Sequence, residues 1–286
     1  MSSIQPPDQS QTPPPPYLRI RASSGWRALD LAQVWQYRDL LFTLAARDVK
    51  LRYKQTALGV IWVVLQPLIA AGIFTFVFGK VAKMPSNGAP FFLFAYAGLL
   101  GWSAFSGTLA KSSACLVGNA HLISKVFFPR LILPLSTVLS SLLDFAVALV
   151  MMFALLVIYG VPIGLSMLLL PVWLILILLL AIGIGLLTAA MTVTYRDVQY
   201  VLPVAINFLM YASPVAYPVS IVPENLRWIY NLNPLASLLE CFRWSLLGSG
   251  NVPVWSIAYS AVLGVVVFVM GAFAFKRMER SFADVI

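Results

Sequence analysis

Long uncharged runs of mostly apolar residues alternate with short charged stretches along the chain. Three of these runs, at 55–79, 84–110 and 198–223, contain 25, 27 and 26 residues. A helix of about 20 apolar residues crosses the ~30 Å hydrocarbon layer of a membrane. Each of the three runs therefore predicts one membrane span.

Two further uncharged runs complete the pattern. The 51 residues at 145–195 are too many for one crossing, and a Gly- and Pro-containing turn signal at 159–164 divides them into two spans. The run at 244–275 opens with Gly, Ser, Asn and Pro, so its helix is expected to begin at Val254. The pattern predicts an all-α, polytopic membrane protein with six transmembrane helices within residues 57–276.

The N-terminal part of the chain has a different pattern. Residues 1–25 contain four consecutive prolines among Ser and Gln, which predicts a disordered, Pro-rich tail. Helical periodicity follows at 26–56 and predicts an amphipathic helix. This helix lies either at the membrane interface, with its basic side toward anionic headgroups, or on a partner as a soluble docked helix. Its apolar face contains Val34, Tyr37, Leu41 and Ala45.

The stretch 214–253, before the last span, contains helices too short to cross. Asn233-Pro234 is typical of a helix start, and Gly248 of the residue after a helix end. The helix between them has about 14 residues, or roughly 21 Å, and a shorter helix is expected at 224–232. We expect a re-entrant helical pair on the outer side. Such backbone is tolerated only under protein or a water-filled cavity, which favours a transport path over a simple anchor.

Composition and charge support this topology. The chain is 60% hydrophobic and 10% charged, against roughly 25% charged residues in soluble domains, which excludes an ordinary soluble globule. The net charge is +9, but the basic residues flank apolar runs instead of forming one soluble face, so nucleic acid is not an expected partner. With six spans, 15 of the 19 Lys and Arg residues lie on one side, which predicts that both termini, including 277–286, are cytoplasmic.

Residues for enzyme chemistry are scarce. The single histidine, His121, has no carboxylate near it in the sequence, and neither a nucleophile elbow nor a phosphate-binding loop is present. Cys115 and Cys241 are expected on opposite sides of the membrane, unpaired, and no metal site is predicted. We therefore expect that the chain is not an enzyme, holds no cofactor and takes its energy from another molecule.

Two groups of residues within the spans are candidates for function. Asp144 is the one ionisable residue predicted deep in a span, where a charge is costly; it either holds helices together, lines or gates a path, or couples protons. Aromatic residues near the span ends serve as interfacial anchors, and some of them are candidates to stack on sugar rings. The candidates for a glycan path are Trp62, Tyr96, Trp102, Tyr211, Tyr217, Trp228 and Tyr230.

Small residues in the spans permit close helix packing, either within one copy of the chain or between two copies. Examples are Gly98, Gly101, Gly183 and Gly185.

Four stretches of sequence form a recognisable set. They are Arg47 to Gln55 leading into Gln66-Pro67-Leu68; Asn119 to Arg130; Tyr195-Arg196-Asp197-Val198; and Asn233-Pro234-Leu235 followed by Glu240, Phe242 and Arg243. In order and spacing they resemble the permease subunit of type-2 ABC exporters, in particular those that move O-antigen, capsular polysaccharide or teichoic acid. The resemblance covers about residues 30–280, and the Pro-rich tail has no counterpart in that family.

The resemblance implies a homodimeric permease in the bacterial inner (plasma) membrane that exports a lipid-linked polysaccharide from the cytoplasm. Two cytoplasmic ATP-binding cassette subunits would bind ATP and Mg and supply the ATPase activity. The loop 111–130 would be the coupling loop, with Asn119, His121 and Lys125 as contacts to the ATPase, and 214–253 would hold gate helices. The expected contacts to the anionic lipid headgroup are Arg38, Arg47, Arg52 and Lys54.

Two other classes of membrane protein are alternatives. A membrane-embedded glycosyl- or acyltransferase needs an acid, a histidine or a metal-ligand cluster at one membrane face, and the sequence offers none. An ion-coupled secondary transporter is expected to have charged or broken spans in two matching halves. Only Asp144 points in that direction.

Overall fold

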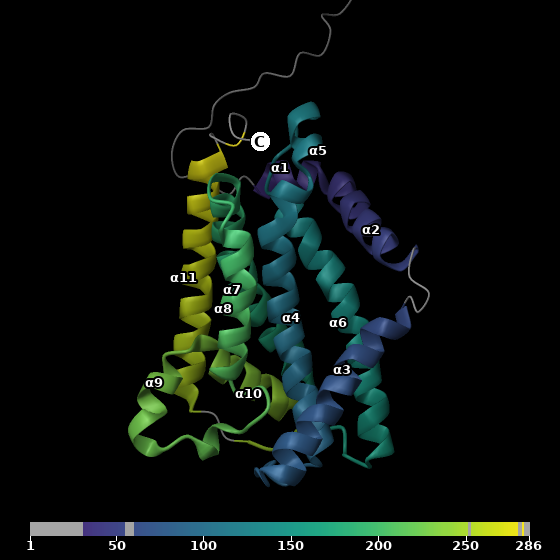
Figure 1. The fold of residues 1–286 in the computed structure, drawn as a ribbon, viewed down its shortest axis with the longest axis vertical. Coiled ribbons are helices and arrows are strands. Elements are labelled where there is room, and N and C mark those ends of the chain that lie inside the picture. Colours follow the sequence, from purple (N-terminus) through teal and green to yellow (C-terminus); the bar gives the residue numbers. More distant parts are fainter. Residues whose placement is uncertain (1–30, 55–59, 251–252, 280–281, 283–286) are drawn as a thin grey trace, which may run out of the picture.

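The computed structural model describes residues 31–54, 60–250, 253–279 and 282, all of which form helices or the turns between them. The predicted Pro-rich tail and the beginning of the predicted amphipathic helix, at 26–30, lie outside the described residues. Long helices run side by side along the longest axis of the molecule, and α1 and α2 lie at one end of this bundle (Figure 1).

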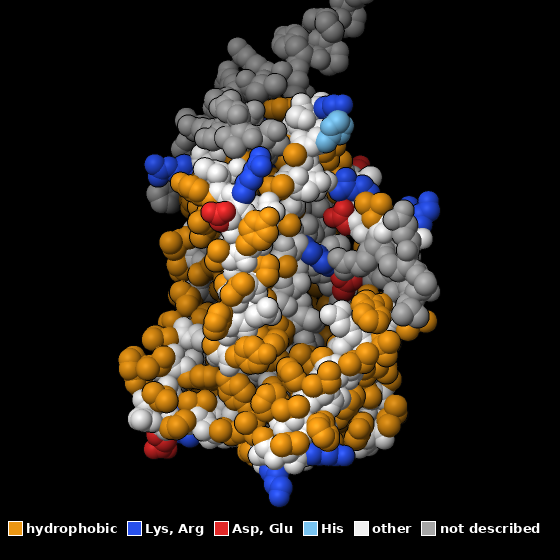
Figure 2. All heavy atoms as spheres, in the orientation of Figure 1, with side chains coloured by type: hydrophobic (Ala, Val, Ile, Leu, Met, Phe, Trp, Pro, Cys, Tyr) orange, Lys and Arg blue, Asp and Glu red, His pale blue; other side chains and the backbone are white. Residues whose placement is uncertain are grey.

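Within the described residues, five helices are long and apolar enough to cross a membrane. Figure 2 shows hydrophobic side chains over much of one face of this bundle, while most of the Lys and Arg side chains on that face lie toward its ends. The five are α3 (Val60–Phe74) with its π-helical continuation η2 (Thr75–Val81), α4 (Phe91–Gly118), α6 (Ile132–Ile158), α7 (Leu170–Thr194) preceded by η3 (Leu165–Leu169), and α11 (Val254–Met278).

The span predicted at 198–223 is shorter than expected. Helix α8 (Val198–Tyr211) has 14 residues, which is roughly 21 Å and less than the ~30 Å hydrocarbon layer. The chain then turns through 212–218 and two 3-10 turns, η4 (Val219–Ile221) and η5 (Glu224–Leu226). Prolines within this stretch lack backbone donors and oppose helix continuation. An uncharged run alone does not distinguish one full span from a short helix followed by a turn.

Helix α10 (Pro234–Leu247) matches its predicted ends, whereas the α-helix predicted at 224–232 begins only at Arg227. Helix α10 begins after Asn233, whose side chain accepts a hydrogen bond from the Leu235 backbone N–H at 3.0 Å, and it ends at Gly248 with a φ of 66°. The shorter α9 (Arg227–Asn231) precedes it. Helix α10 is largely buried and packs against α4, α7 and α11. Protein therefore covers the backbone of α10, as a re-entrant segment requires.

Helix α4 lies at the centre of the bundle, where it packs against α3, α6, α7 and α10. Glycines allow close approach at two places in the bundle. A Cβ at Gly98 on α4 would collide with the carbonyl of Val215, and a Cβ at Gly183 on α7 would lie 2.7 Å from the Phe268 backbone on α11. Gly101 and Gly185 also meet atoms of the same chain, at 2.8 and 2.7 Å. All four glycines named from the sequence thus serve helix packing within one copy.

The N-terminal helices α1 (Leu31–Gln36) and α2 (Arg38–Lys54) cover one end of the bundle, with α2 packed against α6. The predicted apolar face points toward the bundle, and Leu44 joins it in the same hydrophobic cluster. Trp35 on α1 and Phe42 and Leu51 on α2 are exposed. Phe42 and Leu51 are nine residues apart and therefore lie on opposite sides of α2. The fold leaves these large apolar side chains of the N-terminal helices uncovered.

Candidate functional site

The predicted coupling loop is shorter than the sequence indicated. Helix α4 continues for about two turns beyond Lys111 and ends at Gly118, and a six-residue helix, α5 (Ala120–Lys125), follows directly. Asn119 lies between the two helices, and its side-chain amide donates a hydrogen bond to the Cys115 carbonyl at 2.8 Å. The loop predicted at 111–130 is thus the end of α4, the helix α5 and a short connection to α6.

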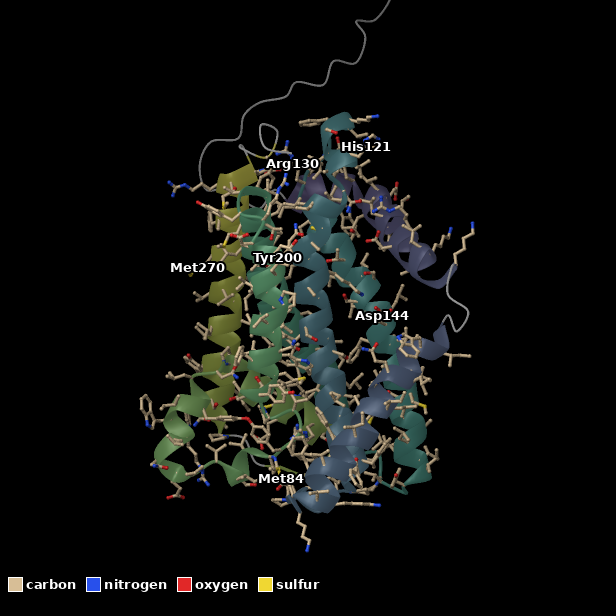
Figure 3. The ribbon with its side chains drawn as sticks, viewed as in Figure 1. Met84, His121, Arg130, Asp144, Tyr200 and Met270 are labelled. Atoms are coloured by element: carbon tan, nitrogen blue, oxygen red, sulfur yellow. The ribbon has the colours of Figure 1, made fainter. Side chains whose placement is uncertain are left out.

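Helix α5 projects from the end of the bundle, and Figure 3 shows His121 near its tip. His121 and Lys125 are exposed, whereas Leu122 and Ile123 pack inward against the bundle. Directly after α5, Val126 and Phe127 are also exposed, with Phe127 at 68%. The segment therefore presents exposed basic and apolar side chains next to one another.

Arg47 was predicted as a headgroup contact and Asn119 as a residue of the coupling loop. In the structure their side chains are hydrogen-bonded to each other. The Arg47 guanidinium donates a hydrogen bond to the Asn119 side-chain oxygen at 2.6 Å and a second one to the Asp48 carboxylate at 3.0 Å. The two residues are 72 positions apart, so no local pattern indicates their contact. This contact links helix α2 directly to the junction of α4 and α5.

The predicted headgroup residues do not form one cluster. Arg38 is exposed, lies over the Trp35 ring and forms an ion pair with Asp39 at 3.8 Å. Lys54 is exposed at the other end of α2, roughly 24 Å away along the helix axis. Arg52 belongs to α2, but its side chain lies outside the described residues. Arg47, 41% exposed, already has two polar partners.

Asp144 has a partner that sequence reasoning missed. The Lys111 ammonium group on α4 lies 2.7 Å from the Asp144 carboxylate on α6, and both side chains are about one-fifth exposed. The neighbouring hydroxyls of Ser136 and Thr137 bond to carbonyls of their own helix instead. Asp144, labelled in Figure 3, therefore belongs to an ion pair between two span-length helices. Lys111 could have indicated this ion pair from the sequence, but the count of Lys and Arg residues on each side of the membrane placed Lys111 in a loop.

The predicted path aromatics separate into distinct groups. Tyr96 and Trp102 are buried in the core, where the Tyr96 hydroxyl donates to the Ala148 carbonyl at 3.0 Å. Neither of these two side chains faces an open surface of the described chain. Exposed aromatics occur on α3 and α9, and a third group gathers beside α8. These aromatics are Trp62 on α3, Trp228 on α9, and the group of Tyr211, Tyr217 and Tyr230.

The contact between Arg47 and Asn119 predicts non-additive changes in stability. Replacing either residue by Ala should lower the free energy of unfolding by about 1 kcal/mol, because a charge-assisted, partly exposed hydrogen bond is lost. The double variant should lose little more than the larger single loss. Thermal unfolding of the purified protein measures this cycle. Arg38→Ala, on the same helix without an Asn partner, is the matched control, and additive losses from the two changes would contradict the contact.

Similarity to known proteins extends over most of the chain. The family described as ABC-2 type transporter matches residues 39–247, from α2 to the end of α10. The O-antigen export system permease protein RfbA of Klebsiella pneumoniae is 30% identical over 256 residues, which cover 87% of this chain and 95% of the relative. RfbA of Myxococcus xanthus is 29% identical over 254 residues, with 88% and 97% covered. The polysialic acid transport protein KpsM of Escherichia coli is 26% identical over 251 residues, with 83% and 93% covered.

Proposed function

This chain belongs to the ABC-2 type transporter family, and we propose that it is the membrane permease of an ATP-driven exporter that moves a lipid-linked polysaccharide out of the cytoplasm. The observation that carries the proposal is the 30% identity to an O-antigen export permease over 87% of the chain. The bundle of span-length apolar helices supports it, because a path through a membrane requires such helices.

We assign ATP hydrolysis to separate cytoplasmic subunits that dock on α5 and the residues after it. The exposed His121, Lys125 and Phe127 form the docking surface in this proposal. Movement of α5 would reach α4 directly and α2 through the contact between Asn119 and Arg47. Arg47 is therefore a positioning residue in this proposal, acting between the docking surface and the N-terminal helices.

The N-terminal helices are assigned to the cytoplasmic membrane interface. The exposed Trp35 and Phe42 would enter the lipid, while Arg38 and Lys54, which are too far apart to contact one headgroup together, would each attract anionic headgroups at the interface. Arg52 is included in this assignment by its sequence alone. The Lys and Arg bias supports a cytoplasmic position for both termini. Helix α8 with the turn after it would complete a sixth crossing in a homodimer in the inner membrane, and α9 with α10 would form the outer gate.

The docking surface provides the test of this function. Replacing Phe127 by Asp should weaken co-purification with the ATP-binding subunit about tenfold or more, which corresponds to about 1.4 kcal/mol, because a charge would enter an apolar contact. Surface polysaccharide, measured with a lectin or antibody on intact cells, should fall with it. Lys80→Ala, at the opposite end of the bundle, is the control. Export that is intact when docking is lost, or purified chain that hydrolyses ATP unaided, would reject the proposal.

A further inference from the structure

A cavity of about 480 Å³ opens between the outer helices, at the end of the bundle opposite α5. It lies among the loop before α4, the 3-10 turn η4, helices α9 and α10, and the start of α11. Met84, in the same loop before α4, marks this end of the molecule in Figure 3. Cavities of roughly 300–1,000 Å³ are the usual size of small-ligand sites in proteins.

Polar side chains are numerous in the wall of this cavity, although the chain is 60% hydrophobic. Seven of its eleven lining residues have side chains that donate or accept hydrogen bonds. They combine amides, hydroxyls, one guanidinium and one carboxylate. Such a mixture matches the many hydroxyl groups of a sugar, each of which both donates and accepts. The polar residues that carry the argument are Asn87, Ser220, Arg227, Asn231, Ser237 and Glu240.

Glu240 supplies the one carboxylate among the residues that line this cavity. Only 9% of the residue is exposed, yet no hydrogen bond or ion pair to its carboxylate is found within the described parts of the chain. The guanidinium of Arg243, one turn later, is near enough to act on Glu240 through space. Its hydrogen bonds nevertheless go to the carbonyls of Pro214 and Val215, and it lies 3.8 Å from the centre of the Phe94 ring.

A largely buried carboxylate without hydrogen-bond donors is costly, and a ligand that supplies donors removes that cost. Arg227 contributes from the rim of the cavity: it is bonded to the Val222 carbonyl at 3.1 Å and to Glu224 at 3.3 Å, and its side chain is still 43% exposed. The hydroxyls of Ser237 and Ser256 bond to each other and hold α10 against α11 in the wall. The site is therefore assembled from several elements around an acceptor without a donor.

We propose that this outer cavity binds a sugar unit of the exported polymer, with the Glu240 carboxylate accepting hydrogen bonds from two neighbouring sugar hydroxyls. The inference rests on the proposed export function and extends it, because it gives the emerging chain a binding site after the membrane crossing. Ser220 and Arg227 contact the same unit from the rim.

The test measures binding separately from transport. The complete transporter in lipid nanodiscs is titrated by calorimetry with oligosaccharides released by mild acid from the surface polysaccharide of the same strain. Glu240→Gln should weaken binding about tenfold, and Ser220→Ala, on a surface turn where folding is not at risk, about threefold. Lys80→Ala, which removes an exposed ionisable side chain outside the cavity lining, should leave binding unchanged.

The possible results distinguish failure of the proposed sugar site from failure of the proposed export function. Equal binding by wild type, Glu240→Gln and Ser220→Ala would overturn the site, as would absence of oligosaccharide binding in a transporter that exports normally. In the second case the export function would stand. If oligosaccharide binds and depends on Glu240 in a transporter that exports no polysaccharide, the site would stand and the export function would fall.

Discussion

Asp144→Asn should lower the free energy of unfolding by about 3 kcal/mol, one of the two largest effects expected of a single substitution in this chain. The Lys111 ammonium group, 2.7 Å from the carboxylate in the native protein, would lose this ion pair between α4 and α6. Removing one partner of a buried ion pair typically costs about 3 to 5 kcal/mol. Because both side chains are about one-fifth exposed, we expect the lower end of that range. Thermal unfolding in detergent measures the loss.

A double variant separates the roles that the sequence left open for Asp144. Replacing Lys111 by Met and Asp144 by Leu together should recover most of the lost stability, since buried pairs are often replaceable by apolar residues of similar volume. If the pair only joins two helices, the double variant also exports polysaccharide. If Asp144 couples protons or gates the path, the double variant is stable and inactive. A double variant less stable than Asp144→Asn would contradict the pair itself.

Gly271→Ala on α11 should destabilise the bundle by about 3 kcal/mol. A Cβ at this position would lie 2.8 Å from the carbonyl carbon of Gly183 on α7, and closer still to its oxygen. Both obstacles are backbone atoms, so the clash is relieved only by moving one helix away from the other. Overpacking of a tight core costs about 1 to 3 kcal/mol and occasionally more. The yield and the thermal midpoint of the purified protein report this change.

Gly264 on the same helix provides the matched control. A Cβ there would meet its nearest neighbour, the Leu176 carbonyl oxygen, at 3.8 Å, an ordinary contact distance. Gly264→Ala should therefore be nearly neutral or slightly stabilising, because Ala favours a helix by about 1 kcal/mol over Gly. Similar losses from both substitutions would contradict the assignment of the Gly271→Ala effect to the close approach of α7 and α11.

Some features of the site were accessible from the sequence because their causes are local. The ends of α10 follow from a side-chain cap at Asn233 and a left-handed backbone at Gly248, and both residues were identified in advance. The position of Asp144 within a span likewise follows from the length of the apolar run around it. In these cases the residues that decide the structure are within a few positions of one another.

Other features depend on contacts between distant segments, and for these the sequence pattern was insufficient. Lys111 was assigned to a loop because a charge usually marks the end of a span, yet the α4 helix continues past it to reach Gly118 and pairs it with Asp144. Tyr96 and Trp102 were among the candidates for a glycan path, and they are buried in the core of the described chain. Helix α8 was expected to be a full span, but the chain turns after 14 residues.

The sequence by itself determined that this chain is a helical membrane protein and where most of its long helices lie, because hydrophobic length and local turn residues are enough for that. It also identified the family through four short motifs. Only the tertiary structure decided which groups are partners: Lys111 with Asp144, Arg47 with Asn119, and the backbones of Gly183 and Gly271. Each of these contacts joins residues 33 or more positions apart. Their energies depend on distances of a few ångströms that exist only after the helices have packed.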